Sequence, residues 1–401
     1  MLTAKTGRLA LFGKADEWWM EHAAKAMPDG IMCGDRKLRA ITFFAEDHGS
    51  AGSVSAEAAA KLIREARVDL LLCSGAANVV NAAAAQAESL ECPFICDFVP
   101  WQSFLYDRGG APGQPFKWTY AHAYGFEDIS TVFVRAWQRL STNKKVGLLF
   151  SDDNHGRLLT EDSSGLPALA ADSGYETVLP ALYALPGTDF TPLIDEFMKQ
   201  GCEICAGDLS TADLAVFWEQ ARQRGFKPKM VSITGALQFP QAVEALGARA
   251  AGMIAEALWQ PTWPYADSIT GKTAAELARD YEVKTGQQWT IGIAQYAKFE
   301  WAVDVFKRVA DILDREDTLA RVRTTRLETC LGLIDFTAPV AAHDPLKTRR
   351  PAENVYKAPV GAWQWQQGKT YPYEPVLLSA GSELEAPSDG SPVPMAYELL
   401  A

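Results

Sequence analysis

Histidine and aspartate are the residues of this sequence that could carry acid–base chemistry. His155, Asp152 and Asp208 could form a proton-transferring set if the chain were an enzyme of the doubly wound α/β class. The sequence has only 5 histidines, and their wide scatter gives no spacing typical of a metal site. The catalytic and nucleotide motifs G-x-S-x-G, H-E-x-x-H and G-x-G-x-x-G do not occur. These observations favour a protein without a cofactor, and they disfavour an enzyme.

Two short segments come close to motifs for phosphate binding and for redox chemistry. Residues 266–273 end in Gly-Lys-Thr, but alanine stands where a phosphate loop needs its first glycine, and two prolines just before exclude a central strand. We expect Thr273 to cap a helix instead. Cys202 and Cys205 have redox spacing, yet they fall on a predicted strand and not at a helix N-terminus. We therefore interpret both as buried structural sulfurs.

Length and composition bound the class of protein. A chain of 401 residues is long enough for two domains. Hydrophobic residues make up 48% and charged residues 22%, which is typical of globular proteins and excludes disordered or collagen-like chains. With 38 Lys and Arg against 50 Asp and Glu, the net charge is −12, so nucleic acid is not the expected partner. No apolar run approaches the ~18 residues of a membrane helix.

Apolar periodicity predicts two successive α/β series. In the first, strands at 8–12, 38–44, 68–73 and 93–96 alternate with helices at 18–26, 55–66 and 79–89. In the second, helices at 129–141, 166–173, 190–200 and 211–224 alternate with strands at 145–150, 175–179, 202–206 and 229–233. Helices at 274–285, 291–315 and 318–322, an antiparallel pair at 360–365 and 374–378, and a loose end from Ser379 follow. This alternation predicts two lobes, each a parallel sheet with helices on its faces.

Aromatic residues gather in the predicted loops, where polar residues are more usual. They include Trp18 early in the first helix, Trp101 after the fourth strand, Tyr120 in the crossover, and Trp259 and Trp263 near the third section. Rings in such loops are typical of a lined binding site, because stacking adds about 0.5–1.5 kcal/mol beyond area burial. The alternative is that these rings pack connecting segments against the lobes.

Several segments, in order along the chain, resemble one known family. They are Arg36-Lys-Leu-Arg-Ala-Ile-Thr-Phe-Phe-Ala-Glu-Asp47, Lys145-Val-Gly-Leu-Leu-Phe-Ser-Asp152, residues 187–194, residues 220–230 and residues 354–365. The chain resembles the leucine/isoleucine/valine-type (type I) periplasmic solute-binding proteins of ABC importers. That resemblance implies two doubly wound, Rossmann-like α/β lobes joined by a three-segment hinge, with a ligand held between the lobes. Lobe 1 would comprise 1–121 with 259–332, lobe 2 would comprise 122–258 with 333–378, and 379–401 would be a C-terminal tail.

The resemblance also implies a set of ligand-binding residues. In lobe 1, the turn of Ser74, Ala76, Ala77 and Asn78 would hold a carboxylate at a helix N-terminus. The remaining residues of the predicted site are Asp97, Phe98 and Trp101 in the next loop, the aromatic-rich wall of Trp18, Tyr120 and His122, and His155, Asp208 and Thr234 in lobe 2.

One departure from the family bears on the ligand. Thr234 stands where amino-acid receptors of this family have a glutamate for the ligand's ammonium group. A buried ammonium without a carboxylate is costly, so an α-amino acid is disfavoured unless Asp208 substitutes. An aromatic or apolar organic acid is the favoured ligand. We expect Trp101→Ala to weaken its binding about tenfold, ~1.4 kcal/mol, with the fold intact.

By the same resemblance, the partners are a small-molecule ligand and the membrane permease of an ABC importer, and the chain is a monomer or weak dimer. It would lie in the periplasm, with its signal peptide absent from this sequence. Two other interpretations remain open, namely a cytoplasmic amide-sensing regulator on the same fold and the α/β enzyme described above.

Overall fold

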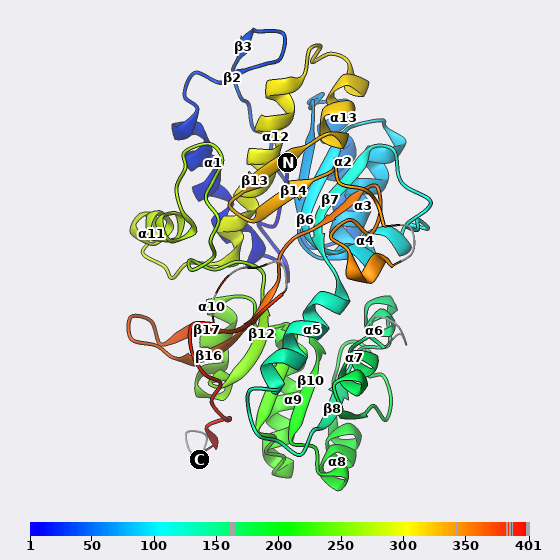
Figure 1. Cartoon of the computed structure of the whole chain (residues 1–401), viewed down its shortest axis with the longest axis vertical. Coiled ribbons are helices and arrows are strands. Elements are labelled where there is room, and N and C mark those ends of the chain that lie inside the picture. The colour runs from blue at the N-terminus through cyan, green and yellow to red at the C-terminus, as the bar shows by residue number, and fades with distance from the viewer. Residues whose placement is uncertain (161–164, 342–343, 382–383, 385, 387, 398–401) are drawn as a thin grey trace. The chain divides into compact units, whose positions relative to one another are not determined.

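The chain folds into two compact units (Figure 1). The computed structural model describes residues 1–160, 165–341, 344–381, 384, 386 and 388–397. Unit 1 comprises Met1–Gly125 with Trp259–Pro359, and unit 2 comprises Phe126–Leu258 with Val360–Ala401, so the chain passes between the units three times. Both units combine parallel strands with helices, which confirms the predicted α/β class.

Unit 1 is built on a four-stranded parallel sheet of order β15-β7-β6-β5. Its strands are β5 (Leu71–Ser74), β6 (Phe94–Pro100), β7 (Thr119–Tyr124) and β15 (Val355–Lys357). Every residue of these strands is buried, as expected when helices cover a parallel sheet. The helices of the first series are α1 (Asp16–Ala26), α2 (Gly52–Arg64), α3 (Ala77–Ser89) and α4 (Trp101–Tyr106).

Short pairs and a later group of helices complete unit 1. The pairs are parallel β1 (Leu2–Thr3) with β4 (Glu46–Asp47), and the hairpins β2 (Ile31–Met32) with β3 (Leu38–Arg39) and β13 (Arg326–Thr329) with β14 (Gly332–Asp335). The later helices are α11 (Ala274–Thr285), α12 (Tyr296–Arg308) and α13 (Arg315–Arg323), with 3-10 turns at Phe12–Ala15, Ile291–Gln295 and Pro345–Lys347. Thr273 caps α11 in a full capping box, which confirms that prediction.

Unit 2 contains a seven-stranded sheet of order β17-β16-β12-β11-β10-β8-β9. Its strands are β8 (Lys145–Leu149), β9 (Glu176–Val178), β10 (Ile204–Leu209), β11 (Met230–Gly235), β12 (Met253–Ala257), β16 (Gly361–Gln367) and β17 (Tyr373–Ala380). β16 and β17 pair antiparallel, as predicted, and β16 is also antiparallel to β12. The strands from β8 to β12 run parallel to one another. The helices are α5 (Phe126–Trp137), α6 (Asn154–Leu159), α7 (Leu166–Asp172), α8 (Thr191–Gln200), α9 (Thr211–Arg224) and α10 (Pro240–Leu246), with a 3-10 turn at Gly247–Ala250.

Two predicted strands of the first series are wrong. Residues 8–11 form turns and Phe12 begins a 3-10 turn. The Ser50 hydroxyl accepts from Leu9 N (2.9 Å) and donates to Thr6 O (2.8 Å), which holds this segment in a bend. Residues 38–44 are a strand only at Leu38–Arg39, where a hairpin forms. Beyond it, Phe43 packs edge-on against Trp19 of α1 (5.7 Å between ring centroids) and does not extend the strand.

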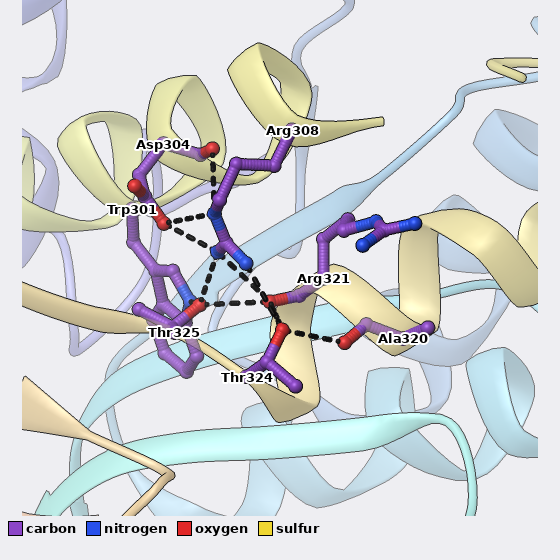
Figure 2. Close-up of polar contacts among 7 residues, drawn as sticks. All are labelled: Trp301, Asp304, Arg308, Ala320, Arg321, Thr324 and Thr325. Carbon is purple, nitrogen blue, oxygen red and sulfur yellow. Dashed lines mark hydrogen bonds and ion pairs between the residues drawn. The ribbon is translucent and has the colours of Figure 1, made fainter. Parts of the chain in front are cut away.

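The long helix predicted at 291–315 is a 3-10 turn at Ile291–Gln295 followed by α12, which ends at Arg308, and Figure 2 shows the polar contacts at that end. The Arg308 guanidinium reaches Asp304 one turn back, and it also donates to the carbonyl of Arg321 (2.9 Å) and to Thr325 Oγ1 (3.0 Å). Trp301 Nε1 donates to the same hydroxyl at 2.9 Å. Arg308 of α12 therefore supplies a hydrogen-bond donor to a carbonyl group in the last turn of α13 and connects the two helices.

The domain boundaries differ from the predicted ones at the first and last crossings. Residues 122–125, with the site candidate His122, were assigned to lobe 2 and lie in unit 1. Residues 333–359, assigned to lobe 2 from the sequence, lie in unit 1, because β15 pairs with β7 of its sheet. The end expected to be loose is ordered at 388–397. There Tyr397 Oη donates to Pro228 O (2.7 Å) and Met395 N donates to Lys229 O (3.1 Å). Residues 382, 383, 385, 387 and 398–401 of the predicted tail lie outside the described residues.

The seven cysteines are all buried and free, including Cys202 and Cys205, which agrees with their interpretation as structural sulfurs. Among the helices that the structure describes, none is long and apolar enough to cross a membrane.

Candidate functional site

Three of the predicted ligand-binding residues form one row across the sheet of unit 1. Ser74 ends β5 and lies in register with Asp97 of β6, which in turn lies in register with His122 of β7. All three side chains are buried. The carboxyl ends of parallel strands are where α/β proteins bind ligands, and the sequence placed its first set of candidates at this edge.

A buried lysine, which the sequence analysis missed, organises this row. Lys298 of α12 places its ammonium 3.2 Å from Asp97 Oδ1 and 3.2 Å from Gln295 Oε1, and it also bonds Ser74 Oγ. Ser74 Oγ contacts Asp97 Oδ1 as well. The Lys298 and Asp97 side chains are only 2% and 1% exposed. Burial raises the pKa of Asp97, and Lys298 opposes that rise.

The predicted carboxylate-binding turn follows Ser74 directly. Gly75 has φ +124°, a conformation that L-residues rarely adopt, and Ala76 is the extended N-cap of α3. Ala76 has no side chain that can cap, so the first backbone N–H groups of α3, at Ala77 and Asn78, receive no side-chain bond from the N-cap. Asn78 is exposed, and its side chain donates to Ser50 O at 3.4 Å. The geometry is suited to an anion.

Phe98 and Trp101 stand where β6 ends. Phe98 has φ +55°, and the register of β6 with β7 shifts between Asp97 and Pro100. A non-glycine residue in this conformation is strained, and such strain occurs preferentially at functional sites. Trp101 begins α4, is 0% exposed, and belongs to the hydrophobic core of unit 1. Because Trp101 is completely buried, we expect Trp101→Ala to destabilise unit 1, contrary to the sequence-based expectation that the fold would stay intact.

The remaining aromatic candidates of unit 1 separate into two places. Tyr120 and His122 lie two residues apart on β7. The Tyr120 hydroxyl accepts from Arg323 Nε at 2.8 Å. Burial lowers the pKa of His122 to about 3, so this imidazole is neutral in the folded unit. Trp18 instead lies on α1 and packs edge-on against Tyr281 of α11 (5.7 Å).

In unit 2, the predicted site residues His155, Asp208 and Thr234 lie close together, although about 80 positions separate the first from the last. His155 of α6 places Nε2 3.3 Å from Asp208 Oδ2 at the end of β10, and these side chains are 32% and 21% exposed. Phe126 meets the His155 ring edge-on at 4.7 Å. Burial raises the pKa of Asp208, and the nearby His155 opposes the rise. Asp208 lies in register with Thr234 of β11.

Thr234 is bonded to a carboxylate that the sequence analysis missed. Its Oγ1 donates to Glu256 Oε1 of β12 at 2.7 Å, and Gly235 N donates to the same oxygen at 3.1 Å. Gln238 Nε2 also bonds this oxygen. Glu256 is 0% exposed, and Oε2 has no hydrogen-bond donor within the described part of the chain. The sequence does contain one indication of this residue, a single glutamate inside the apolar run Met253-Ile-Ala-Glu-Ala257. A carboxylate in a buried strand is costly unless other groups bond it.

Glu256 should make stability depend on pH. Burial raises its pKa from 4.5 to about 7, so the folded protein keeps this proton to a higher pH than the unfolded chain does. The free energy of unfolding should therefore fall by up to about 3 kcal/mol as the pH rises from about 4.5 to about 7. Glu256→Gln cannot titrate, so it should gain stability relative to the parent over that window.

Denaturant unfolding of the Glu256→Gln variant and the parent at about pH 5 and about pH 8 measures this difference. The exposed Glu244→Gln, in α10 of the same unit, is the matched control and should show no such gain. An equal stability difference between Glu256→Gln and the parent at both pH values would contradict the assignment.

Comparison with protein families identifies the chain. A family model described as periplasmic binding protein matches residues 1–353, which is most of the sequence. The chain belongs to the periplasmic binding protein family. A comparison with curated proteins found no match. Membership of a family of binding proteins supports the interpretation of this chain as a solute-binding receptor and not as an enzyme.

Solved structures of periplasmic binding proteins share this fold at low sequence identity. One is the LivJ substrate-binding protein of a branched-chain amino acid transporter from Streptococcus pneumoniae, solved with isoleucine; it is 15% identical over 96% of this chain and 98% of its own, with a TM-score of 0.69. A second, an ABC transporter solute-binding protein from Rhodopseudomonas palustris solved with 3,4-dihydroxybenzoic acid, is 15% identical over 96% and 97%, with a TM-score of 0.70. A third, from the same species and solved with benzoate, is 16% identical over 96% and 97%, with a TM-score of 0.66.

Proposed function

We propose that this periplasmic binding protein is the receptor of an ABC importer for a small aromatic or apolar organic acid. The observation that carries the proposal is the polar edge of each sheet, with an uncapped helix N-terminus in unit 1 and the His155–Asp208 pair in unit 2. The two Rhodopseudomonas palustris proteins of the same fold, solved with aromatic acids, support this ligand class. Location in the periplasm and recognition by a membrane permease are part of the same proposal.

The N-terminus of α3 is the proposed anchor for the carboxylate. The first backbone N–H groups of a helix lack partners within the helix, and the helix dipole favours an anion there. Ala76 and Ala77 leave this end of the helix without a competing side-chain acceptor.

A second candidate ligand is an α-amino acid, and one observation favours it. Thr234 lacks a carboxylate of its own, but Asp208 lies in register with it on the neighbouring strand and is 21% exposed. Asp208 could therefore pair the ligand's ammonium group, which is the substitution that the sequence left open. The two candidate ligands differ in charge. An α-amino acid carries an ammonium group that needs a carboxylate partner, whereas an organic acid carries only its carboxylate.

A thermal-shift screen of the full chain tests the function. We expect aromatic acids to raise the melting temperature by mass action, whereas amides and polyols leave it unchanged. A rise with α-amino acids alone would favour the second candidate. If no member of the screen shifts the melting temperature, and calorimetry also detects no binding, the proposed ligand classes are wrong.

His155→Ala should weaken binding of the solute found in that screen. Removing the imidazole takes away one polar contact and the edge of a ring, so we expect about a tenfold loss of affinity, ~1.4 kcal/mol, by isothermal titration calorimetry. Asp152→Asn is the matched control, because Asp152 is 53% exposed and pairs with Arg157. Unchanged affinity in His155→Ala would remove this residue from the site, and turnover of the solute by the parent would replace the receptor with an enzyme.

A further inference from the structure

Unit 1 contains a pocket that is separate from the Ser74–Asp97–His122 row. It has a volume of about 390 Å³ and lies between α1, α11 and the loop that precedes α11. Its lining includes Trp18, Glu21, His22 and Lys25 of α1, and Asp280 and Lys284 of α11. Pockets that hold small ligands begin at about 300 Å³, so this one is large enough for a single ring with its substituents.

Aromatic side chains form one wall of this pocket. The rings of Trp18 and His22 are stacked, with centroids 5.3 Å apart and planes at 16°. Tyr296, which does not line the pocket, meets the His22 ring edge-on at 5.0 Å. His22 Nε2 is buried and has no hydrogen-bond partner among the residues that the structure describes. A polar nitrogen left in this way is expected to bond a ligand or a water molecule.

The charged residues of the pocket leave an excess of positive charge. Three lysines face two carboxylates, and both carboxylates are already paired, Glu21 with Lys284 at 3.0 Å and Asp280 with Lys272. Lys25 Nζ lies 3.9 Å from Glu21, too far for a hydrogen bond, so its three donors stay available. The lining residues therefore carry one positive charge in excess, in a chain whose net charge is −12.

We propose that this pocket is a second ligand site, for a small organic monoanion with a flat ring. The anion would pair with Lys25 and neutralise the single excess charge, and the ring would lie along Trp18 and His22. A cation is disfavoured because both acidic groups are occupied, and a bare inorganic anion would leave most of the volume and the aromatic wall unused. This proposal does not depend on the identity of the transported solute.

Benzoate is the probe for the test, with benzamide and benzylamine as its neutral and cationic analogues. Hydrogen exchange of the full chain should show that benzoate protects amides in α1 and α11, and that the two analogues at equal concentration do not. Lys25→Gln should weaken this benzoate binding about fivefold or more, ~1 kcal/mol. Lys347→Gln is the matched control, with the same change in net charge in the same unit, on a side chain that is 85% exposed.

The outcomes separate this site from the proposed solute site. His155→Ala lies in unit 2 and should leave the protection of α1 and α11 unchanged, whichever solute the receptor binds. Equal protection by benzamide would show that the lysines do not select an anion. Absence of protection at saturating benzoate, or an equal loss of affinity in Lys25→Gln and Lys347→Gln, would overturn the proposal.

Discussion

Lys298→Met should destabilise unit 1 by about 3–5 kcal/mol, one of the two largest effects we expect from a single substitution. The substitution leaves Asp97 buried without its cation, and Asp97 Oδ2 already has no donor within the described residues. An unpaired carboxylate in this position must either stay charged at great cost or take up a proton. Denaturant unfolding at neutral pH measures the loss.

Two variants control this experiment. Asp97→Asn added to Lys298→Met removes the unpaired charge and should recover part of the lost stability. Lys199→Met breaks an exposed pair with Glu196 at 2.9 Å, where the lysine side chain is 70% exposed, and should cost less than about 1 kcal/mol. If Lys298→Met costs no more than Lys199→Met, the buried ion pair does not contribute as its geometry indicates.

The Lys298 contacts also connect two distant parts of the sequence. Lys298 lies on α12, whereas Ser74 precedes the turn that leads into α3, and the two side chains are bonded. A loss of this bond should therefore disturb the turn proposed to hold the ligand's carboxylate. In the double variant, whose charge is balanced, any remaining loss of ligand affinity would report on that positioning effect.

Trp101→Ala is the second large effect, and we expect it to cost about 3–5 kcal/mol of unfolding free energy. The ring is 0% exposed, lies in the core of unit 1 and meets Tyr106 edge-on at 5.5 Å, so its removal leaves a cavity that the surroundings cannot fill. Thermal and denaturant unfolding measure this cost. Damage to the core would by itself weaken ligand binding in this variant, so a loss of binding does not by itself show that Trp101 contacts the ligand.

The conservative Trp101→Phe should retain most of the stability, because it keeps an aromatic ring in the same place. Leu313→Ala is the surface control, since Leu313 is 88% exposed, and it should change stability by less than about 0.5 kcal/mol. Wild-type stability in Trp101→Ala, together with a tenfold loss of affinity, would return Trp101 to its sequence-based role as a ligand contact.

The sequence predicted unit 2 more accurately than the start of unit 1. Helix 211–224 and the antiparallel closing strands were located closely, because their apolar residues follow one period and turn residues bound them. The strands at 8–12 and 38–44 failed because both segments are fixed by side chains from elsewhere. Ser50 bends the first, and the packing of Phe43 on α1 redirects the second. No local pattern records such contacts.

For the site, the family resemblance selected Ser74, Asp97, His155, Asp208 and Thr234, which the structure places on β5, β6, α6, β10 and β11. Family resemblance, later confirmed by the family model, indicated a binding protein. Lys298 and Glu256 could not be assigned in this way, because each lies on a different element and reaches the site only through the packing of α12 and β12.

The sequence by itself determined the α/β class, the two series of strands and helices, and the family. The tertiary structure alone decided which charges meet. It buried Trp101 in a core, joined Lys298 to a row of residues some 200 positions away, and set a carboxylate beside Thr234. The physical reason is that secondary structure follows from local periodicity, whereas the cost of burying a charge depends on partners that only the folded chain brings within bonding distance.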